Sequence, residues 1–119
     1  MERIWRATLN TINGLRAAAA SEAAFRQELF ALALAVPLAM VIATSLWMAL
    51  ILIGAVLAIM IVELLNTAIE KLADRVTLDH DPMIGRAKDM GSAAVGLSLL
   101  LAGAVWLLAI WERLSGLLW

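Results

Sequence analysis

Cysteine is absent from this chain of 119 residues, and charged residues make up only 16% of it. The lack of cysteine excludes disulfide bonds and thiolate metal sites. His80 is the single histidine, so a zinc site built on histidine would lack a second imidazole ligand, and we do not expect one. The net charge of −1 leaves no basic excess for a nucleic-acid partner.

Two glycine-rich phosphate-binding loops are also missing. The chain contains neither Gly-x-x-x-x-Gly-Lys-Ser/Thr nor Gly-x-Gly-x-x-Gly, which hold nucleotide phosphates in P-loop and dinucleotide-binding folds. The familiar soluble kinase folds are therefore disfavoured, and any nucleotide chemistry needs a site of another design. We expect no cleavable signal peptide, because the first apolar run starts late and lacks a small-residue cleavage motif.

Hydrophobic residues, in contrast, account for 64% of the chain, whereas about half is usual in a soluble domain. A membrane-spanning helix needs roughly 20 apolar residues. The charge-free stretch 29–62 is long enough for two such helices with a turn near 44–47, and Met90–Trp111 is long enough for a third. The sequence predicts an all-α membrane protein with one membrane domain. Its spans lie at about 29–46, 49–69 and 90–111, with a loop at about 77–87 and the last helix starting near Ala87.

Lysine and arginine are divided unequally between the two sides of these spans. One side carries eight of the nine, and the other carries only Arg113. The positive-inside rule then predicts a cytoplasmic N-terminus and loop 77–87, with the C-terminus outside. Trp47, Trp111 and Trp119 fall near the outer interface, as in an aromatic belt.

Residues 1–27 have the pattern of an amphipathic helix lying on the membrane surface. Apolar residues share one broad face and arginines lie largely on the other, which is typical of an interfacial helix. Asn13-Gly14 is a candidate break in it. Ser21 is the expected N-cap of the following helix, which runs into the first span.

Glu63 is the most informative single residue, because it lies within the apolar run. A carboxylate at membrane depth costs roughly 2.5–3.5 kcal/mol on insertion scales and is normally functional. Asn66 and Glu70 follow at i+3 and i+7, so all three share a helix face. Partial desolvation would bring Glu63 toward the range of a general base. The alternative is a neutral structural carboxyl group in a helix interface.

Further carboxylates and a lysine are expected on the same side of the membrane. Hard oxygen ligands next to a lysine suit Mg²⁺ and a phosphate-bearing substrate. Lys71 and Arg75, in contrast, have the pattern of an ordinary solvated helix end. The arginines of the first helix have the simpler alternative of binding anionic lipid head groups. The polar set in question is Glu22, Glu28, Glu63, Asn66, Glu70, Asp74, Lys88 and Asp89.

Three strings together resemble the prokaryotic diacylglycerol kinase family over nearly the whole chain. They are Ser-Glu-Ala-Ala-Phe-Arg-Gln-Glu (21–28), Glu-Leu-Leu-Asn-Thr-Ala-Ile-Glu (63–70) with Asp74-Arg75, and Gly-Arg-Ala-Lys-Asp-Met-Gly-Ser-Ala-Ala (85–94). The resemblance implies a homotrimeric inner-membrane enzyme whose sites are shared between subunits. It would transfer the γ-phosphate of ATP to diacylglycerol and give phosphatidic acid, with Mg²⁺ as cofactor.

The resemblance also implies roles for individual residues. Glu63 matches the catalytic base, and Glu22 and Glu70 match the metal-binding glutamates. The implied ATP-binding residues are Arg3, Glu22, Glu70, Lys88 and Asp89, with Lys88 at the phosphates. The implied lipid-substrate residues are Glu63, Asn66, Ser92, Gln27 and Glu28.

Two alternatives stay open from the sequence. A related branch of the family phosphorylates undecaprenol, although its members carry a more basic string at 21–28, which favours diacylglycerol here. A non-enzymatic ion-binding membrane subunit could also bury Glu63, but it would not need a lysine for phosphate.

Overall fold

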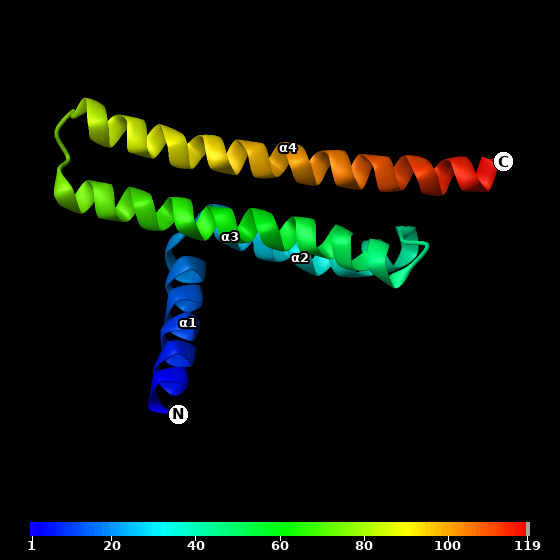
Figure 1. The fold of residues 1–119 in the computed structure, drawn as a ribbon, viewed down its shortest axis with the longest axis horizontal. Helices are drawn as coiled ribbons and strands as arrows, with labels where there is room; N and C mark the ends of the chain where they lie inside the picture. The colour runs from blue at the N-terminus through cyan, green and yellow to red at the C-terminus, as the bar shows by residue number, and fades with distance from the viewer. Residues whose placement is uncertain (119) are drawn as a thin grey trace.

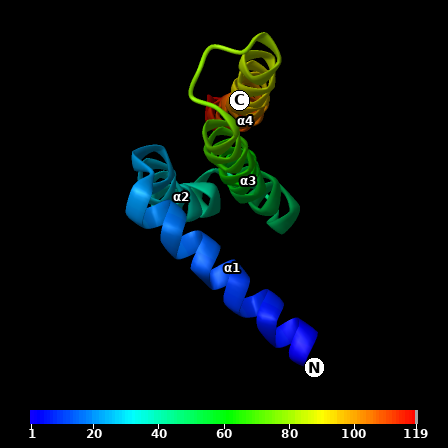
Figure 2. The same cartoon turned by 90° about the vertical axis from the view of Figure 1, so that its left-hand side faces the viewer.

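The protein is a bundle of long helices with one helix set at a steep angle to the rest (Figures 1 and 2). The computed structural model describes the backbone of residues 1–118 and the side chains of residues 1–116. Helices α2, α3 and α4 run alternately up and down the bundle, and α1 projects from it. Within these described residues, α2, α3 and α4 are each long and apolar enough to cross a membrane. The predicted fold, an N-terminal helix followed by three candidate spans, is confirmed. The helices are α1 (Glu2–Ser21), α2 (Ala23–Ile42), α3 (Leu46–Val76) and α4 (Pro82–Leu118).

Short polar caps start the two longest helices. The Ser45 hydroxyl accepts a hydrogen bond from the Met48 amide at 3.1 Å, at the first turn of α3. Asp81 accepts bonds from the Met83 and Ile84 amides at 2.9 and 3.1 Å. Such caps satisfy amides that have no partner within the helix.

The prediction that the last helix starts near Ala87 was therefore wrong. It starts at Pro82, which leaves only residues 77–81 between α3 and α4. Asp81 provides the cap, and proline is favoured at the first helical position because its missing N–H has no partner there anyway. The Asp-Pro pair is thus the true start signal.

Helices α1 and α2 meet at an elbow formed by one extended residue, Glu22, with φ −116° and ψ 111°. The prediction of Ser21 as an N-cap was wrong, because Ser21 ends α1 and its hydroxyl donates to the Ala17 carbonyl at 2.8 Å. Arg26 donates from α2 to the carbonyls of Ala19 and Ala20 at 2.9 and 3.2 Å. A cation on the last carbonyls of α1 stabilises this helix end.

The candidate break at Asn13-Gly14 is not observed, since α1 is continuous across it. A glycine inside a helix costs about 1 kcal/mol relative to alanine. The run Ala17–Ala20 that follows is made of the best helix former, which offsets this cost. The polar pair therefore does not end the helix.

Two apolar clusters hold the bundle together at opposite ends. One surrounds the elbow, where Ala18 of α1, Phe25 of α2 and Met60 of α3 are buried together. The other lies near the α2–α3 turn and buries Ala39, Leu52 and Ala109. The many buried alanines allow the helices to approach closely.

The indole groups concentrate near the second cluster. Trp106 donates from its Nε1 to the Leu52 carbonyl at 2.9 Å and so ties α4 to α3. Trp47 and Trp111 lie toward the same end and are 76% and 68% exposed. Their location at the outer membrane interface stays a prediction, and Trp119 lies outside the described residues.

Candidate active site

Glu63 lies half-buried on α3. Its neighbours Met60 and Leu64 pack against Ala18 and Phe25. Glu28 of α2 is also partly buried. One Glu28 oxygen, Oε1, is buried and has no hydrogen-bond partner among the described residues. Two carboxylates at membrane depth, one of them with an unpaired oxygen, are costly and indicate a functional site.

One turn further along α3, Asn66 is buried between α3 and α4, with 8% of its surface exposed. Its Nδ2 donates to Glu70 Oε1 at 3.2 Å. Its Oδ1 is buried and has no hydrogen-bond partner in the described structure. Gly91 faces this oxygen from α4, and a Cβ atom at residue 91 would overlap it. A glycine at this position therefore lets the two helices approach with a polar side chain between them.

A mostly apolar groove of about 480 Å³ opens beside Asn66, between α3 and α4. Asn66 is the polar side chain on its wall, and the rest of the lining is aliphatic, with one methionine. Such a groove suits an acyl chain whose polar end lies at the amide group. The lining residues are Val62, Leu65, Asn66, Ile69, Ala87, Met90, Gly91 and Ala94.

Lys88 forms an ion pair with Asp74 across the α3–α4 interface. Its Nζ donates to Asp74 Oδ1 at 2.5 Å, and the two side chains are 39% and 49% exposed. Lys88 is therefore near the surface, where a soluble phosphate group can reach it. The sequence predicts Asp74 among the carboxylates on the cytoplasmic side of the spans, but it gives no sign of the pairing with Lys88.

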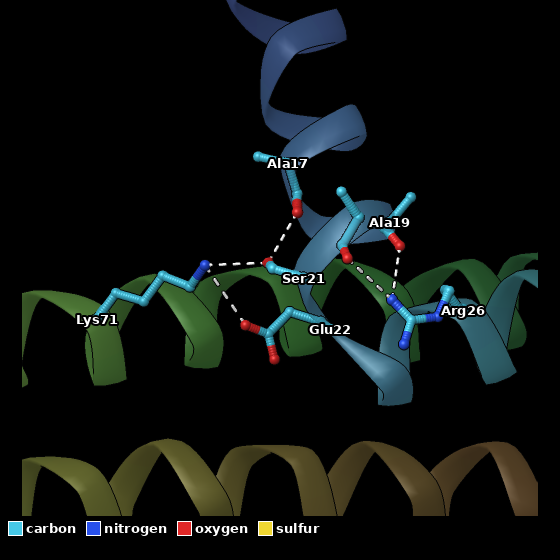
Figure 3. Close-up of polar contacts among 7 residues, drawn as sticks. Ala17, Ala19, Ser21, Glu22, Arg26 and Lys71 are labelled. Carbon is cyan, nitrogen blue, oxygen red and sulfur yellow. Dashed lines mark hydrogen bonds and ion pairs between the residues drawn. The ribbon is translucent and has the colours of Figure 1, made fainter.

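Glu22 forms an ion pair at the elbow with a partner that the sequence did not indicate. Lys71 of α3 brings its Nζ to 3.5 Å from Glu22 Oε1 and donates to the Ser21 hydroxyl at 3.1 Å (Figure 3). Lys71 had the pattern of a solvated helix end, since it follows Glu70 and precedes Arg75. The available signal was its position on the helix face of Leu64 and Ala68, one turn beyond the latter.

The remaining candidate residues are on exposed surfaces, and one of them is remote. Gln27, Asp89 and Ser92 are exposed on α2 and α4. Arg3 lies near the free end of α1, far from the elbow (Figure 1). At 1.5 Å per residue, the helix places it about 28 Å from Glu22 along the axis. Within one chain the structure does not bring Arg3 to the other candidates.

The residues that could hold a metal ion are two glutamates. No cluster of three histidine, aspartate or glutamate side chains occurs in the described part of the chain. Mg²⁺ commonly takes one or two protein carboxylates and completes its shell with phosphate oxygens and water. Glu70 accepts the hydrogen bond from Asn66 through Oε1, and Glu22 forms the ion pair with Lys71 through Oε1. Each glutamate thus has a second oxygen without a protein partner in the described structure, which fits that coordination.

Comparison with known proteins identifies the family. The family described as prokaryotic diacylglycerol kinase matches residues 9–110. The chain belongs to this family. The diacylglycerol kinase of Escherichia coli is 44% identical over 111 residues, which cover 93% of this chain and 91% of that protein. Those of Pseudomonas aeruginosa and Haemophilus influenzae are 40% and 37% identical, and the alignments cover 89% and 83% of this chain and 86% and 84% of theirs.

Family membership and the three apolar helices together support two general statements. The protein is a kinase, and therefore a transferase that uses ATP and a divalent metal ion. It is a multi-pass membrane protein, since α2, α3 and α4 can each span a bilayer. The resemblance seen in the sequence is confirmed at the level of the family.

Proposed function

We propose that this protein transfers the γ-phosphate of ATP to the hydroxyl group of diacylglycerol and releases phosphatidic acid and ADP. The observation that carries the proposal is the position of Glu63. It is a half-buried carboxylate within a candidate span, and it lies one helical turn before Asn66, which lines the groove between α3 and α4. A lipid hydroxyl can reach such a carboxylate from the bilayer, whereas ATP approaches from the aqueous side.

In the proposed reaction, Glu63 accepts the proton of the lipid hydroxyl. The hydroxyl oxygen then forms a bond to the γ-phosphorus of ATP, and the bond from that phosphorus to its bridging oxygen breaks. Asn66 orients the lipid at the mouth of the groove, with Ser92, Gln27 and Glu28 as further lipid contacts. Positioned proton transfer of this kind contributes about 10²- to 10⁴-fold to a rate.

The ATP side of the proposed site uses the exposed charges. Glu22 and Glu70 would hold Mg²⁺, which supplies charge neutralisation to the phosphates when bound. Lys88 would leave Asp74 for the phosphate oxygens, because a compact ammonium suits the charge that develops there. Asp89 and Arg3 complete the proposed nucleotide contacts.

We further propose a homotrimer in the cell inner membrane, with sites shared between subunits. Arg3 lies too far from Glu22 to serve the same site within one chain, which supports sharing. Large apolar side chains also remain exposed on the candidate spans, for example Leu100 at 72% and Leu107 at 69%, and a second copy can cover part of them. In this proposal the N-terminus and the loop 77–81 lie in the cytoplasm, where ATP is available.

The decisive assay uses the purified full-length protein in detergent micelles with ATP and Mg²⁺. Diacylglycerol, undecaprenol or no lipid is added, and the products are identified by mass spectrometry. We expect phosphatidic acid with diacylglycerol and much slower turnover with undecaprenol. Faster phosphorylation of undecaprenol would make the protein an undecaprenol kinase, and no lipid phosphate from either would leave the ion-binding alternative.

The metal assignment predicts how two variants respond to Mg²⁺. Glu22→Gln and Glu70→Gln should each raise the Mg²⁺ concentration for half-maximal activity by roughly tenfold, because each removes a hard anionic ligand. Excess Mg²⁺ should restore part of the rate in at least one of them. Unchanged Mg²⁺ dependence in both would remove them from the metal site.

Sharing of sites can be tested by mixing subunits. Glu63→Gln and Lys88→Leu chains are each expected to be nearly inactive alone. If the two residues serve one site from different chains, mixed trimers regain activity well above either variant. Activity no higher than the average of the two single variants would indicate that both residues of each site come from one chain.

A further inference from the structure

Lys71 is a cation with no role in the proposed reaction, yet it lies on a carboxylate that the reaction needs. Its Nζ is 3.5 Å from Glu22 Oε1 and donates to the Ser21 hydroxyl at 3.1 Å. The Ser21 hydroxyl in turn donates to the Ala17 carbonyl at 2.8 Å. Figure 3 shows the Lys71 side chain reaching from α3 to both elbow residues. One ammonium group therefore contacts the last turn of α1 and the side chain of the elbow residue.

The remainder of α1 has little else to hold it to the bundle. Every residue from Met1 to Ala17 is exposed, and the first buried residue of the helix is Ala18. Figure 2 shows α1 extending away from the other helices beyond this end. In the described structure, the hydrogen bond and ion pair of Lys71 are the side-chain polar contacts between α1 or its elbow and α3. Loss of this contact would leave α1 attached by the Arg26 hydrogen bonds and the buried Ala18, and would loosen its attachment to α3.

The Lys71 ammonium group also lies close to the position that a metal ion bound by Glu22 would take. A divalent cation bound by Glu22 would lie within a few ångströms of Lys71 Nζ, and two cations so close repel each other. Although the second oxygen of Glu22 has no protein partner in the described structure, the repulsion between the two cations makes simultaneous binding of both to this carboxylate unfavourable. Binding of a divalent cation at Glu22 therefore favours departure of Lys71.

We propose that Lys71 is a latch, a positioning residue that holds Glu22 and the α1 elbow until a divalent cation displaces it. The proposal rests on the proposed function only in assigning a metal ion to Glu22. It makes the angle of α1 depend on cation binding even without nucleotide. It also predicts that the native lysine weakens binding of the free cation.

The first test measures Mn²⁺ binding to the full-length protein in micelles by electron paramagnetic resonance, without nucleotide. Lys71→Met should bind Mn²⁺ about two- to fivefold more tightly than the parent protein, as expected for removing a competing, partly exposed charge. The matched control is Arg75→Met, which removes the same charge from α3 one turn away. No ion pair of Arg75 occurs among the described residues, so its effect should be much smaller. The gain should vanish in Lys71→Met/Glu22→Gln.

The second test follows the position of α1. Because the chain has no cysteine, a single Thr8→Cys substitution on exposed α1 provides one spin-label site. Mg²⁺ should raise the mobility of this label in the parent protein. Lys71→Met should show the higher mobility already without Mg²⁺, and Arg75→Met should behave as the parent does.

Three results would overturn the latch. The first is equal Mn²⁺ affinity in Lys71→Met, Arg75→Met and the parent protein. The second is a higher Mn²⁺ affinity that persists in Lys71→Met/Glu22→Gln. The third is a label mobility that responds to neither Lys71→Met nor Mg²⁺. Failure of the latch alone leaves phosphatidic acid production and the Mg²⁺ response of Glu22→Gln intact. Failure of the metal assignment instead appears as a Glu22→Gln protein that binds Mn²⁺ as the parent does.

Discussion

Helices pack closely at both ends of the bundle, but the two ends differ in the polar atoms that this packing buries. At the turn end, Ala39, Leu52 and Ala109 are buried with apolar neighbours, and the Trp106 indole finds a carbonyl partner. At the elbow end, buried oxygens of Glu28 and Asn66 have no hydrogen-bond partner in the described structure. Both ends bring helices close through small residues, yet among the described side chains buried unsatisfied polar atoms occur only at the elbow end.

This difference distinguishes the turn end, whose packing contributes to stability, from the elbow end, whose buried polar atoms indicate a function. An unsatisfied buried polar atom costs about 1–3 kcal/mol, so a sequence selected for packing alone would avoid it. The turn end shows that this chain can pack its helices without that cost. The lipid contacts proposed for Glu28 and Asn66 would give these buried oxygens a partner.

The largest effect should come from removing the carboxylate at the centre of the elbow end. Glu63→Gln keeps the shape of the side chain but removes the base, and turnover should fall by about 10²- to 10⁴-fold. Thermal stability should hold or rise, because the cost of a carboxylate at membrane depth disappears. Turnover in mixed micelles and thermal unfolding measure the two effects.

The matched control for Glu63→Gln is Glu112→Gln, which changes an exposed carboxylate at the turn end. We expect normal turnover in this variant. Near-normal turnover in Glu63→Gln itself would make Glu63 a structural residue. The elbow end would then not differ from the turn end by a role of this carboxylate in the reaction.

Lys88→Leu should have the next largest effect. In the proposed site it removes a cation from the position where negative charge spreads over the phosphoryl oxygens, and loss of one such group costs roughly 10²- to 10³-fold in kcat. The KM for lipid should change little, because the lipid approaches from the groove beside Asn66. Lys88→Arg should recover only part of the rate, since a planar guanidinium does not replace a compact ammonium. A fully active arginine variant would reduce Lys88 to an interface anchor.

Gly91→Ala tests the close contact between α3 and α4 at the elbow end. The added Cβ would overlap Asn66 Oδ1, and overpacking of this kind costs about 1–3 kcal/mol. We expect a lower thermal midpoint and reduced turnover, because Asn66 must move. Gly14→Ala is the control, since nothing lies within 4 Å of its new Cβ. It should be neutral or stabilising by up to about 1 kcal/mol, as alanine is the better helix former. A Gly91→Ala protein as stable as the parent would show that Asn66 is not confined.

The smallest effect is expected at the turn end. Trp106→Phe removes the hydrogen bond to the Leu52 carbonyl but keeps an aromatic ring in place. Hydrogen bonds between membrane helices contribute about 0.6 kcal/mol on average, so the thermal midpoint should fall slightly and turnover should not change. Trp111→Phe, at an exposed residue, provides the control. A loss of turnover in Trp106→Phe without a loss of stability would show that the turn end also acts in the reaction.

Much of the elbow end could be anticipated because its signals are local. The spacing of Glu63, Asn66 and Glu70 follows from the helical repeat, and the strings around them identify the family. The predicted start of α4 near Ala87 was wrong, although Asp81 and Pro82 are a local signal, because Asp, Pro and Gly are also typical of loops. Lys71 has the pattern of a solvated helix end, because cations are favoured in the last turn of a helix, whereas its partners Ser21 and Glu22 lie on the other side of the first span in the sequence.

By itself, the sequence determined which segments are helical, which of them can span a membrane and which polar residues are out of place there. These properties depend on composition and on periodicity within one segment. Only the tertiary structure decided that Lys71 meets Glu22, that Lys88 meets Asp74 and that Gly91 faces Asn66. Such pairs depend on how two helices are rotated and shifted against each other, and that arrangement is set by the packing of the bundle as a whole rather than by either segment alone.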